Sequence, residues 1–179
     1  MSKTSLDSPD RNWWSAPIGL DEIIWITIAF IWGIFMTFMM VYWYYAGDQN
    51  QTGESFRISA EAFEVKMDKM IEDYQVGEEH GYPIVAVPEG GDIYIQANQF
   101  SFPVIPKIRV GKTYRFHLNS ADVNHGFSIQ PVNINLQLVP GYDYILKLTP
   151  NSTGDFHIVC NEFCGIGHHE MLGKIIVTE

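Results

Sequence analysis

The sequence predicts an all-β domain, a Greek-key sandwich or barrel, joined to one N-terminal transmembrane α-helix. Three observations predict this class. A run of 23 residues, Ile23 to Tyr45, carries no charged side chain. After Gly81, apolar residues recur at every second position, as in strands with one buried and one solvated face. Clusters of Gly, Pro, Asn and Asp interrupt this alternation at short intervals, as turns do between strands.

Composition narrows the classes of function. Of the 179 residues, 46% are hydrophobic and 18% are charged, which argues against disorder. The net charge of −10 makes nucleic acid a poor partner and a basic protein a good one. The chain has two cysteines, too few for the disulfide framework of a domain this large. They form either one local disulfide or part of a metal site.

The charge-free run predicts a membrane anchor at residues 21–46, preceded by an N-terminal cytoplasmic segment at residues 1–20. A helix of that run is about 34 Å long, enough to cross a hydrocarbon core of about 30 Å. The alternatives are a buried core helix, for which the run is too uniformly apolar, and a cleaved signal peptide. Lys3 and Arg11 precede the helix and the next cation is Arg57, so the positive-inside rule favours an internal N-terminus.

Residues 47–80 are expected to form a linker that contains an amphipathic helix from Ser55 to Tyr74. Apolar residues recur there at steps of three or four, which predicts one apolar stripe: Phe56, Ala60, Phe63, Met67, Met70 and Ile71. The stripe is interpreted as packing against the membrane surface, a partner subunit or the following domain. Its methionines are interpreted as packing residues and not as metal ligands.

Residues 81–179 are expected to form the β domain. The alternation predicts nine strands, at Pro83–Val87, Asp92–Ala97, Ile105–Val110, Lys112–Asn119, Gly126–Gln130, Asn133–Val139, Tyr142–Thr149, Phe156–Cys160 and Lys174–Thr178.

A metal-binding pattern lies between the last two predicted strands. Cys160, Cys164, His168 and Met171 are spaced by four, four and three residues. Cysteine and methionine are soft ligands that select copper, and imidazole suits copper as well. Gly165 and Gly167 allow the loop to fold tightly.

The second cysteine bears on the kind of copper site. A mononuclear blue-copper site uses one cysteine, two histidines and a weak axial methionine, so a second cysteine is redundant there. Two thiolates can instead bridge two copper ions, and such a site needs a further ligand from outside the loop. His125 is the best candidate, because it lies at the start of another predicted strand and Gly126 allows close approach of the backbone. A local disulfide between the cysteines is the alternative.

These residues resemble a known family. Residues 160–171 match the pattern C-x-E-x-C-G-x-x-H-x-x-M of the CuA centre in subunit II of the haem–copper oxidases. Asp122-Val123-x-His125 is similar to the motif of the family's first histidine. Asn133-Ile134-Asn135 and Val139-Pro140-Gly141 are similar to the single-span, B-type branch. The resemblance covers roughly residues 92–179 and the anchor in outline, and it implies a cupredoxin-like fold.

The resemblance also implies a ligand set. In it, Cys160 and Cys164 bridge two copper ions. His125 and Met171 complete one ion, while His168 and the backbone carbonyl of Glu162 complete the other. His168 is preferred to His169 because it falls in register with the motif. The resemblance further implies, as in some family members, a Mg²⁺ ion held by the Glu162 side chain at the contact with the catalytic subunit.

The remaining three histidines fall outside the motif and are interpreted as structural or surface residues: His80, His117 and His157.

The implied function is electron entry into a respiratory terminal oxidase. Cytochrome c is the expected donor, haem in the catalytic subunit I is the acceptor, and O₂ reduction with proton translocation occurs on that other chain. The copper domain is expected on the outer, periplasmic or extracellular face of the cell membrane. All five tryptophans precede residue 44, so the exposed tryptophan that many relatives use for electron entry is missing. Asp122, Phe100 and Phe102 are the expected donor-docking residues.

Three other functions stay open at this point. The same copper module occurs on nitric oxide reductases, whose reducing site also lies on another chain. A copper-binding or copper-delivery protein without a catalytic complex is the second alternative, and a free-standing blue-copper carrier is the third.

Overall fold

The computed structural model describes residues 11–15, 17–47, 53–132 and 134–179. The chain forms two compact units, residues 1–49 and 50–179. Lys3 and the other residues at positions 1–10 lie outside the described residues, as does Asn133 of the predicted sixth strand.

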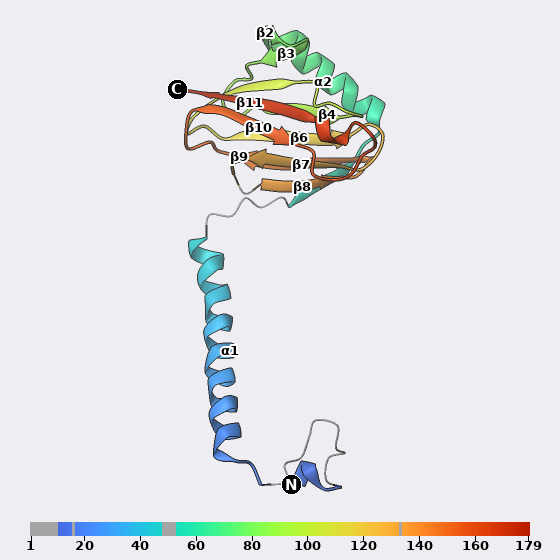
Figure 1. Cartoon of the computed structure of the whole chain (residues 1–179). Coiled ribbons are helices and arrows are strands. Elements are labelled where there is room, and N and C mark those ends of the chain that lie inside the picture. Colours follow the sequence, from blue (N-terminus) through green and yellow to red (C-terminus); the bar gives the residue numbers. More distant parts are fainter. Residues whose placement is uncertain (1–10, 16, 48–52, 133) are drawn as a thin grey trace. The chain divides into compact units, whose positions relative to one another are not determined.

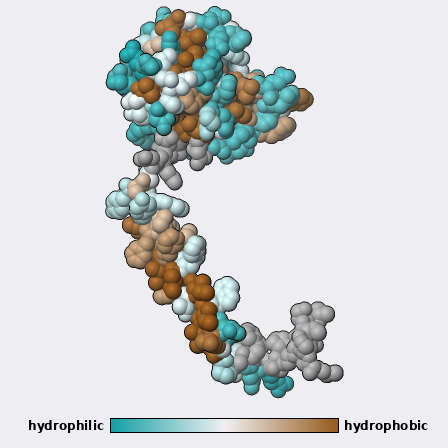
Figure 2. Space-filling view, turned by 60° about the vertical axis from the view of Figure 1, so that its left-hand side comes forward, coloured by the Kyte–Doolittle hydropathy of each residue, from teal (hydrophilic) through white to brown (hydrophobic). Residues whose placement is uncertain are grey.

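The first unit contains a short 3₁₀ turn, η1 (Trp13–Ser15), and one long helix, α1 (Leu20–Ala46) (Figure 1). Helix α1 is long and apolar enough to cross a membrane, and none of its residues is buried in the protein. Figure 2 shows hydrophobic side chains gathered along it. The hydroxyls of Thr27 and Thr37 donate to the carbonyls of Ile23 and Gly33, at 2.7 and 2.8 Å. Both hydroxyls are therefore satisfied within the helix, as an apolar surrounding requires.

The second unit is a β sandwich with one covering helix, α2 (Ala60–Tyr74). Its strands are β1 (Glu54–Arg57), β2 (Gln75–Glu79), β3 (Tyr82–Val85), β4 (Asp92–Ala97), β5 (Ile105–Arg109), β6 (Tyr114–Ser120), β7 (His125–Gln130), β8 (Ile134–Leu138), β9 (Tyr142–Leu148), β10 (Gly154–Val159) and β11 (Leu172–Thr178).

The strands form two sheets of mixed direction. One sheet has the order β1-β9-β6-β4 and the other the order β2-β3-β5-β11-β10-β7-β8. Strand pairs β4–β6, β3–β5 and β5–β11 are parallel, and the other pairs are antiparallel. Such crossovers between two packed sheets are Greek-key connections. The predicted cupredoxin-like, all-β class is confirmed.

Alternate residues of both sheets build the core. Ile93, Phe116 and Leu146 of the four-stranded sheet and Phe127 and Ile158 of the seven-stranded sheet are at most 2% exposed. They belong to one hydrophobic cluster, which also contains both cysteines and Met171. The metal-binding loop is therefore continuous with the packed interior, which restricts how far its ligands can move.

Helix α2 packs its apolar stripe against β4 of the following domain. Its residues Phe63, Met67 and Met70 are buried, and the Phe63 ring meets Tyr94 of β4 edge-on at 5.6 Å. The Gln96 side chain of β4 donates to the Ala60 carbonyl at 2.8 Å. Of the three surfaces considered for the apolar stripe, the following domain is the one it covers.

The helix was predicted from Ser55 to Tyr74; its end at Tyr74 is confirmed, but its start was wrong. Ser55 to Arg57 belong to strand β1, paired with β9, and Phe56 is 58% exposed instead of lying on the helical stripe. The helix begins later because the Ser59 side chain accepts the Ala62 N–H at 3.2 Å, an N-cap. After the helix, β2 pairs with β3 around a turn at His80 and Gly81, both with positive φ. That strand lies within residues 47–80, which were expected to form a linker.

Replacing Phe63 by alanine tests the packing of α2. The side chain is fully buried, so its removal leaves a cavity and should lower the free energy of unfolding by about 3–5 kcal/mol. Val65 lies on the same helix but is 68% exposed, and Val65→Ala should change stability by less than about 0.5 kcal/mol. Chemical unfolding of the full chain in detergent measures both. Equal effects of the two substitutions would contradict this packing.

Candidate metal centre

Strand pairing brings the predicted ligands together. Cys160 directly follows β10, and Met171 directly precedes β11, so the loop between them is held at both ends by paired strands. Strand β10 is also antiparallel to β7, with Val159 opposite Ser128. The end of β10 therefore lies beside the start of β7, and His125 at that start reaches the loop.

The two cysteines face each other without a bond. Their sulfurs are 3.9 Å apart, whereas a disulfide requires about 2.05 Å. Both are free and buried, which contradicts the local-disulfide alternative. Burial raises the pKa of the Cys164 thiol to about 11, and the neighbouring Cys160 adds to the shift. The interior thus disfavours a bare thiolate at Cys164, and a cation between the two sulfurs would compensate for its charge.

Four further donor atoms surround the sulfurs. His125 Nδ1 lies 3.9 Å from Cys160 Sγ, and the Glu162 carbonyl oxygen lies 3.2 Å from the same sulfur. His168 Nδ1 and Met171 Sδ lie 3.6 and 3.8 Å from Cys164 Sγ. Every residue of the predicted ligand set is therefore present at one place, with its donor atom turned inward.

The donor spacing fits bound metal. A first-row metal ion lies about 2.3 Å from a thiolate and about 2.0–2.1 Å from an imidazole nitrogen. Two ligands of one ion can thus be at most about 4.6 Å apart for two thiolates and about 4.4 Å for a thiolate and an imidazole. The separations of 3.9, 3.9 and 3.6 Å satisfy these limits. Among the described residues, His125, Cys160 and Cys164 form the one close group of three such ligands.

Asp122 fixes the orientation of His125, a role that the sequence did not reveal. Its Oδ1 lies 2.7 Å from His125 Nε2, so this nitrogen carries the proton and Nδ1 is left for metal. Burial alone would raise the pKa of Asp122. The bonds from His125 and from the backbone N–H groups of Val123 and Gln99 outweigh that effect and hold the pKa below its usual value. The carboxylate therefore stays ionised beside the imidazole.

Gly126 allows the loop to lie directly on β7. A Cβ atom at this position would stand 1.9 Å from Asn161 Oδ1 and 2.8 Å from the Glu162 backbone nitrogen. The close approach predicted from the sequence is therefore found, and its neighbour is the part of the loop that carries the Glu162 carbonyl.

The structure leaves one of the two expected docking phenylalanines exposed and buries the other. Phe100 is 37% exposed and stays available, but Phe102 is 1% exposed and packs on Phe127 in the core, so that part of the prediction was wrong. Gln99 and Phe100 form a turn between the bridged residues Asn98 and Ser101, so Phe100 and Phe102 do not share one face of a strand, as their spacing of two had suggested. The sequence analysis missed Phe163 and Ile166, which are 80% and 94% exposed on the metal loop itself. The sequence does contain a signal for this surface, because apolar residues stand between the ligands, where they cannot all be buried with them.

Magnesium has no support at Glu162. Its side chain is exposed, and its carboxylate belongs to none of the close groups of His, Cys and acidic ligands found among the described residues.

The other histidines lie away from the loop ligands. His80 and His157 are exposed, and the His169 side chain is 74% exposed, as expected for the residue next to His168. His117 is buried, and its Nδ1 lies 2.8 Å from Asp143 Oδ2 on the neighbouring strand β9.

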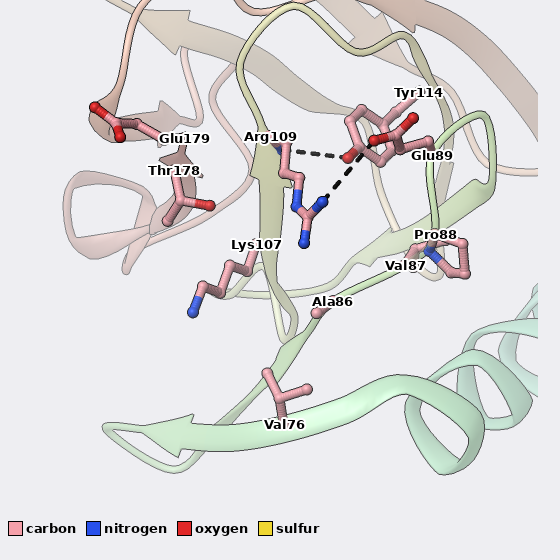
Figure 3. Close-up of a pocket in the computed structure, with 10 residues that line it drawn as sticks. All are labelled: Val76, Ala86, Val87, Pro88, Glu89, Lys107, Arg109, Tyr114, Thr178 and Glu179. Atoms are coloured by element: carbon pink, nitrogen blue, oxygen red, sulfur yellow. Dashed lines mark hydrogen bonds and ion pairs between the residues drawn. The ribbon is translucent and has the colours of Figure 1, made fainter.

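A separate cleft of about 550 Å³ lies at the other end of β11 from the metal loop (Figure 3). Lys107 and Arg109 line it, and Arg109 faces Glu89 at 3.9 Å. The Tyr114 hydroxyl accepts the Arg109 backbone N–H at 3.2 Å. The cleft contains none of the predicted metal ligands, so we place the metal chemistry at the loop.

Comparison with known proteins finds relatives that are described as subunit 2 of cytochrome c oxidase. Residues 95–179 match the family described as cytochrome c oxidase subunit II, periplasmic domain. Cytochrome c oxidase subunit 2 of Thermus thermophilus is 34% identical over 93 residues, which are 51% of this chain and 69% of that protein. A second subunit 2 from the same species is also 34% identical over 93 residues. They again make up 51% of this chain but only 55% of that protein.

One solved structure covers more of the chain. A chain from the cryo-EM structure of a heme-copper terminal oxidase dimer is 25% identical and superposes with a TM-score of 0.54. The match covers 88% of this chain and 99% of that one, so it includes more than the β domain alone.

Gly126→Ala tests the contact between β7 and the loop. The new methyl group must displace Asn161 and Glu162, so we expect the chain to bind less copper, with an altered absorption spectrum of what remains. Gly77→Ala is the matched control, since a Cβ there meets only Ile84 Cδ1 at an ordinary 3.8 Å. Copper per chain is measured after gentle purification. Full, spectrally unchanged loading of Gly126→Ala would refute the contact.

Proposed function

The chain belongs to the cytochrome c oxidase subunit II family, and from this premise we propose that the loop and His125 bind two copper ions as a CuA centre. As a subunit II it is part of an oxidoreductase complex with a haem-bearing catalytic subunit. We propose further that it takes electrons from cytochrome c and passes them to that haem, for O₂ reduction coupled to proton translocation.

The observation that carries the proposal is the pair of unbonded cysteines. The two sulfurs are 3.9 Å apart, and each has its own imidazole within 3.9 Å. The site thus offers ligands for two ions, and both sulfurs are available to each ion. A blue-copper site with a single ion would use both histidines and the methionine but only one cysteine, so it would leave one sulfur without a role, whereas a pair of ions uses all of these donors. The near-symmetry of the donors therefore supports two ions and disfavours a blue-copper site.

Each residue has a defined task in this proposal. Cys160 and Cys164 would hold both ions, His125 and Met171 would complete the ligands of one, and His168 and the Glu162 carbonyl would complete those of the other. When bound, the copper pair would supply a one-electron redox centre. Asp122 holds the His125 ring in place, and the buried sulfurs exclude water. Ligands fixed before and after electron transfer keep the reorganisation small, which makes the transfer fast.

The loop's exposed side chains form the docking surface in this proposal. Phe163 and Ile166 alternate with buried ligands, so a partner that contacts them lies close to the copper ions. From Gly47 onward the chain carries seventeen Asp and Glu residues and nine Lys and Arg residues, which favours encounter with a basic cytochrome c.

The proposed orientation has the N-terminus in the cytoplasm and the copper domain outside. Lys3 and Arg11 lie before α1, and the first cation after it is Arg57, as the positive-inside rule requires for this orientation. The matching family is described by its periplasmic domain, which supports the same side.

Cys160→Ser and Cys164→Ser test the binuclear centre. The wild-type chain should give near-infrared absorption and a seven-line EPR pattern, as expected of one electron shared by two equivalent copper nuclei. Each cysteine bridges both ions, so either substitution should abolish the shared signal. A four-line pattern in the wild type would instead support a mononuclear copper carrier, and a shared signal that survives in either mutant would refute the bridging role.

Ile166→Asp tests the docking surface. The side chain is 94% exposed and supplies no donor atom, so the copper spectrum should stay unchanged. Electron entry from reduced cytochrome c, followed by stopped flow on the intact complex, should slow about tenfold or more, since a charge replaces the apolar contact. Val76→Asp is the control, because Val76 is 61% exposed at the distant cleft. Equal rates for both variants would place the donor elsewhere.

A further inference from the structure

One exposed residue contacts both halves of the candidate copper site. The Gln99 backbone N–H donates to Asp122 Oδ2 at 2.8 Å, and the other oxygen of that carboxylate accepts from His125. The Gln99 side-chain amide donates to the carbonyl oxygen of Cys164. His125 comes from β7 and Cys164 from the loop after β10, so Gln99 links two ligands that are far apart in sequence.

The next residue contacts the loop between two ligands. A Cβ atom built on Gly167 would stand 2.5 Å from the Phe100 ring, and one on Gly165 would stand 3.0 Å from it. The ring therefore lies flat against the stretch that joins Cys164 to His168. Gly165 has a φ of +138°, which itself favours glycine, but Gly167 has no positive φ. Glycine at 167 is explained by the ring and not by the turn that the sequence suggested.

The backbone hydrogen bonds of this stretch are local: the His168 N–H donates to the Gly165 carbonyl at 3.1 Å, and the Glu170 N–H donates to the Gly167 carbonyl at 3.0 Å. Ile166, in its middle, is 94% exposed, so the loop has solvent on one face and Phe100 on the other. If metal binding must order the loop, the lost conformational entropy weakens the binding. A loop that is already held in place does not have this cost. Contacts around the ligands commonly change metal affinity by 10–100-fold for this reason.

We propose that Gln99 and Phe100 are positioning residues for the copper centre: they hold the Cys164–His168 stretch and, through Asp122, the His125 ring in ligand geometry before metal binds. The role in copper binding rests on the proposed function, whereas the ordering of the metal-free loop does not. Neither side chain is a ligand.

The first test removes the hydrogen-bond donors of Gln99 and keeps its length. Gln99→Met should lower the affinity for copper about tenfold against a competing Cu(I) chelator, and it should shift the near-infrared band. Gln75→Met is the matched control, because the Gln75 amide also donates to a backbone carbonyl, that of Gly77 at 3.3 Å, but far from the loop. Copper affinity and band position equal to those of the control would overturn the role of Gln99.

The second test is a double-mutant cycle on the ring contact. Gly167→Ala should clash with Phe100 and lower copper affinity, and Phe100→Ala should lower it through loss of support. In the double mutant the clash is relieved, so the combined loss should be smaller than the product of the two single losses. Independent effects would show that the ring does not press on Gly167 and would overturn the contact. Phe100→Tyr, which keeps the ring, should retain wild-type affinity.

A third measurement separates this proposal from the copper assignment. In the metal-free full chain, Phe100→Ala should speed hydrogen exchange of the amides at residues 164–168 at least about tenfold, without changing exchange in β6. This result needs no copper. If the wild type lacked the shared copper signal but showed this protection, the proposed function would fail and the ordering role would stand. Unchanged exchange would overturn the ordering role even if the copper signal were present.

Discussion

The antiparallel pairing of β7 with β10 is the constraint on which the metal centre depends. It sets Ser128 opposite Val159, and this register brings His125 at the start of one strand beside Cys160 at the end of the other. A slip of one residue would turn His125 to the opposite face of the sheet. The register is fixed in turn by buried residues such as Phe127 and Ile158, which must face the core. Core packing thus determines the distance between sulfur and imidazole.

The site combines burial with access to the surface in a single loop. Cys160, Cys164 and Met171 are at most 5% exposed, whereas Phe163 and Ile166 between them are at least 80% exposed. The ligands gain rigidity and exclusion of water from the core. On the proposed docking surface, the exposed side chains would bring a partner within a short distance of these ligands. An electron-transfer site needs both properties, because transfer slows with distance and with movement of the ligands.

Much of this could be predicted from sequence, and the errors share a cause. The ligands from Cys160 to Met171 follow from spacing in one short loop, and most strands follow from alternation, which is local. The bond from Asp122 to His125 spans only three residues, and the residue types alone do not show that the two side chains meet. The contacts of Gln99 and Phe100 could not be predicted, because each joins segments that are 23 to 67 residues apart. The burial of Phe102 was missed for the same reason: its neighbour Phe127 lies on another strand. The strand β1 was missed because its partner β9 lies far along the chain.

The supports of the two histidines differ, and the difference follows from their positions in the fold. His125 is fully buried at the start of a strand, and the Asp122 carboxylate fixes its ring. His168 lies half-buried in the 3₁₀ turn η2 (His168–Glu170), where the Phe163 ring meets it edge-on at 5.9 Å. A hydrogen bond to an ionised carboxylate restrains a ring more strongly than one exposed aromatic contact. His168 is therefore the less restrained of the two histidines, because its aromatic contact, Phe163, itself faces outward.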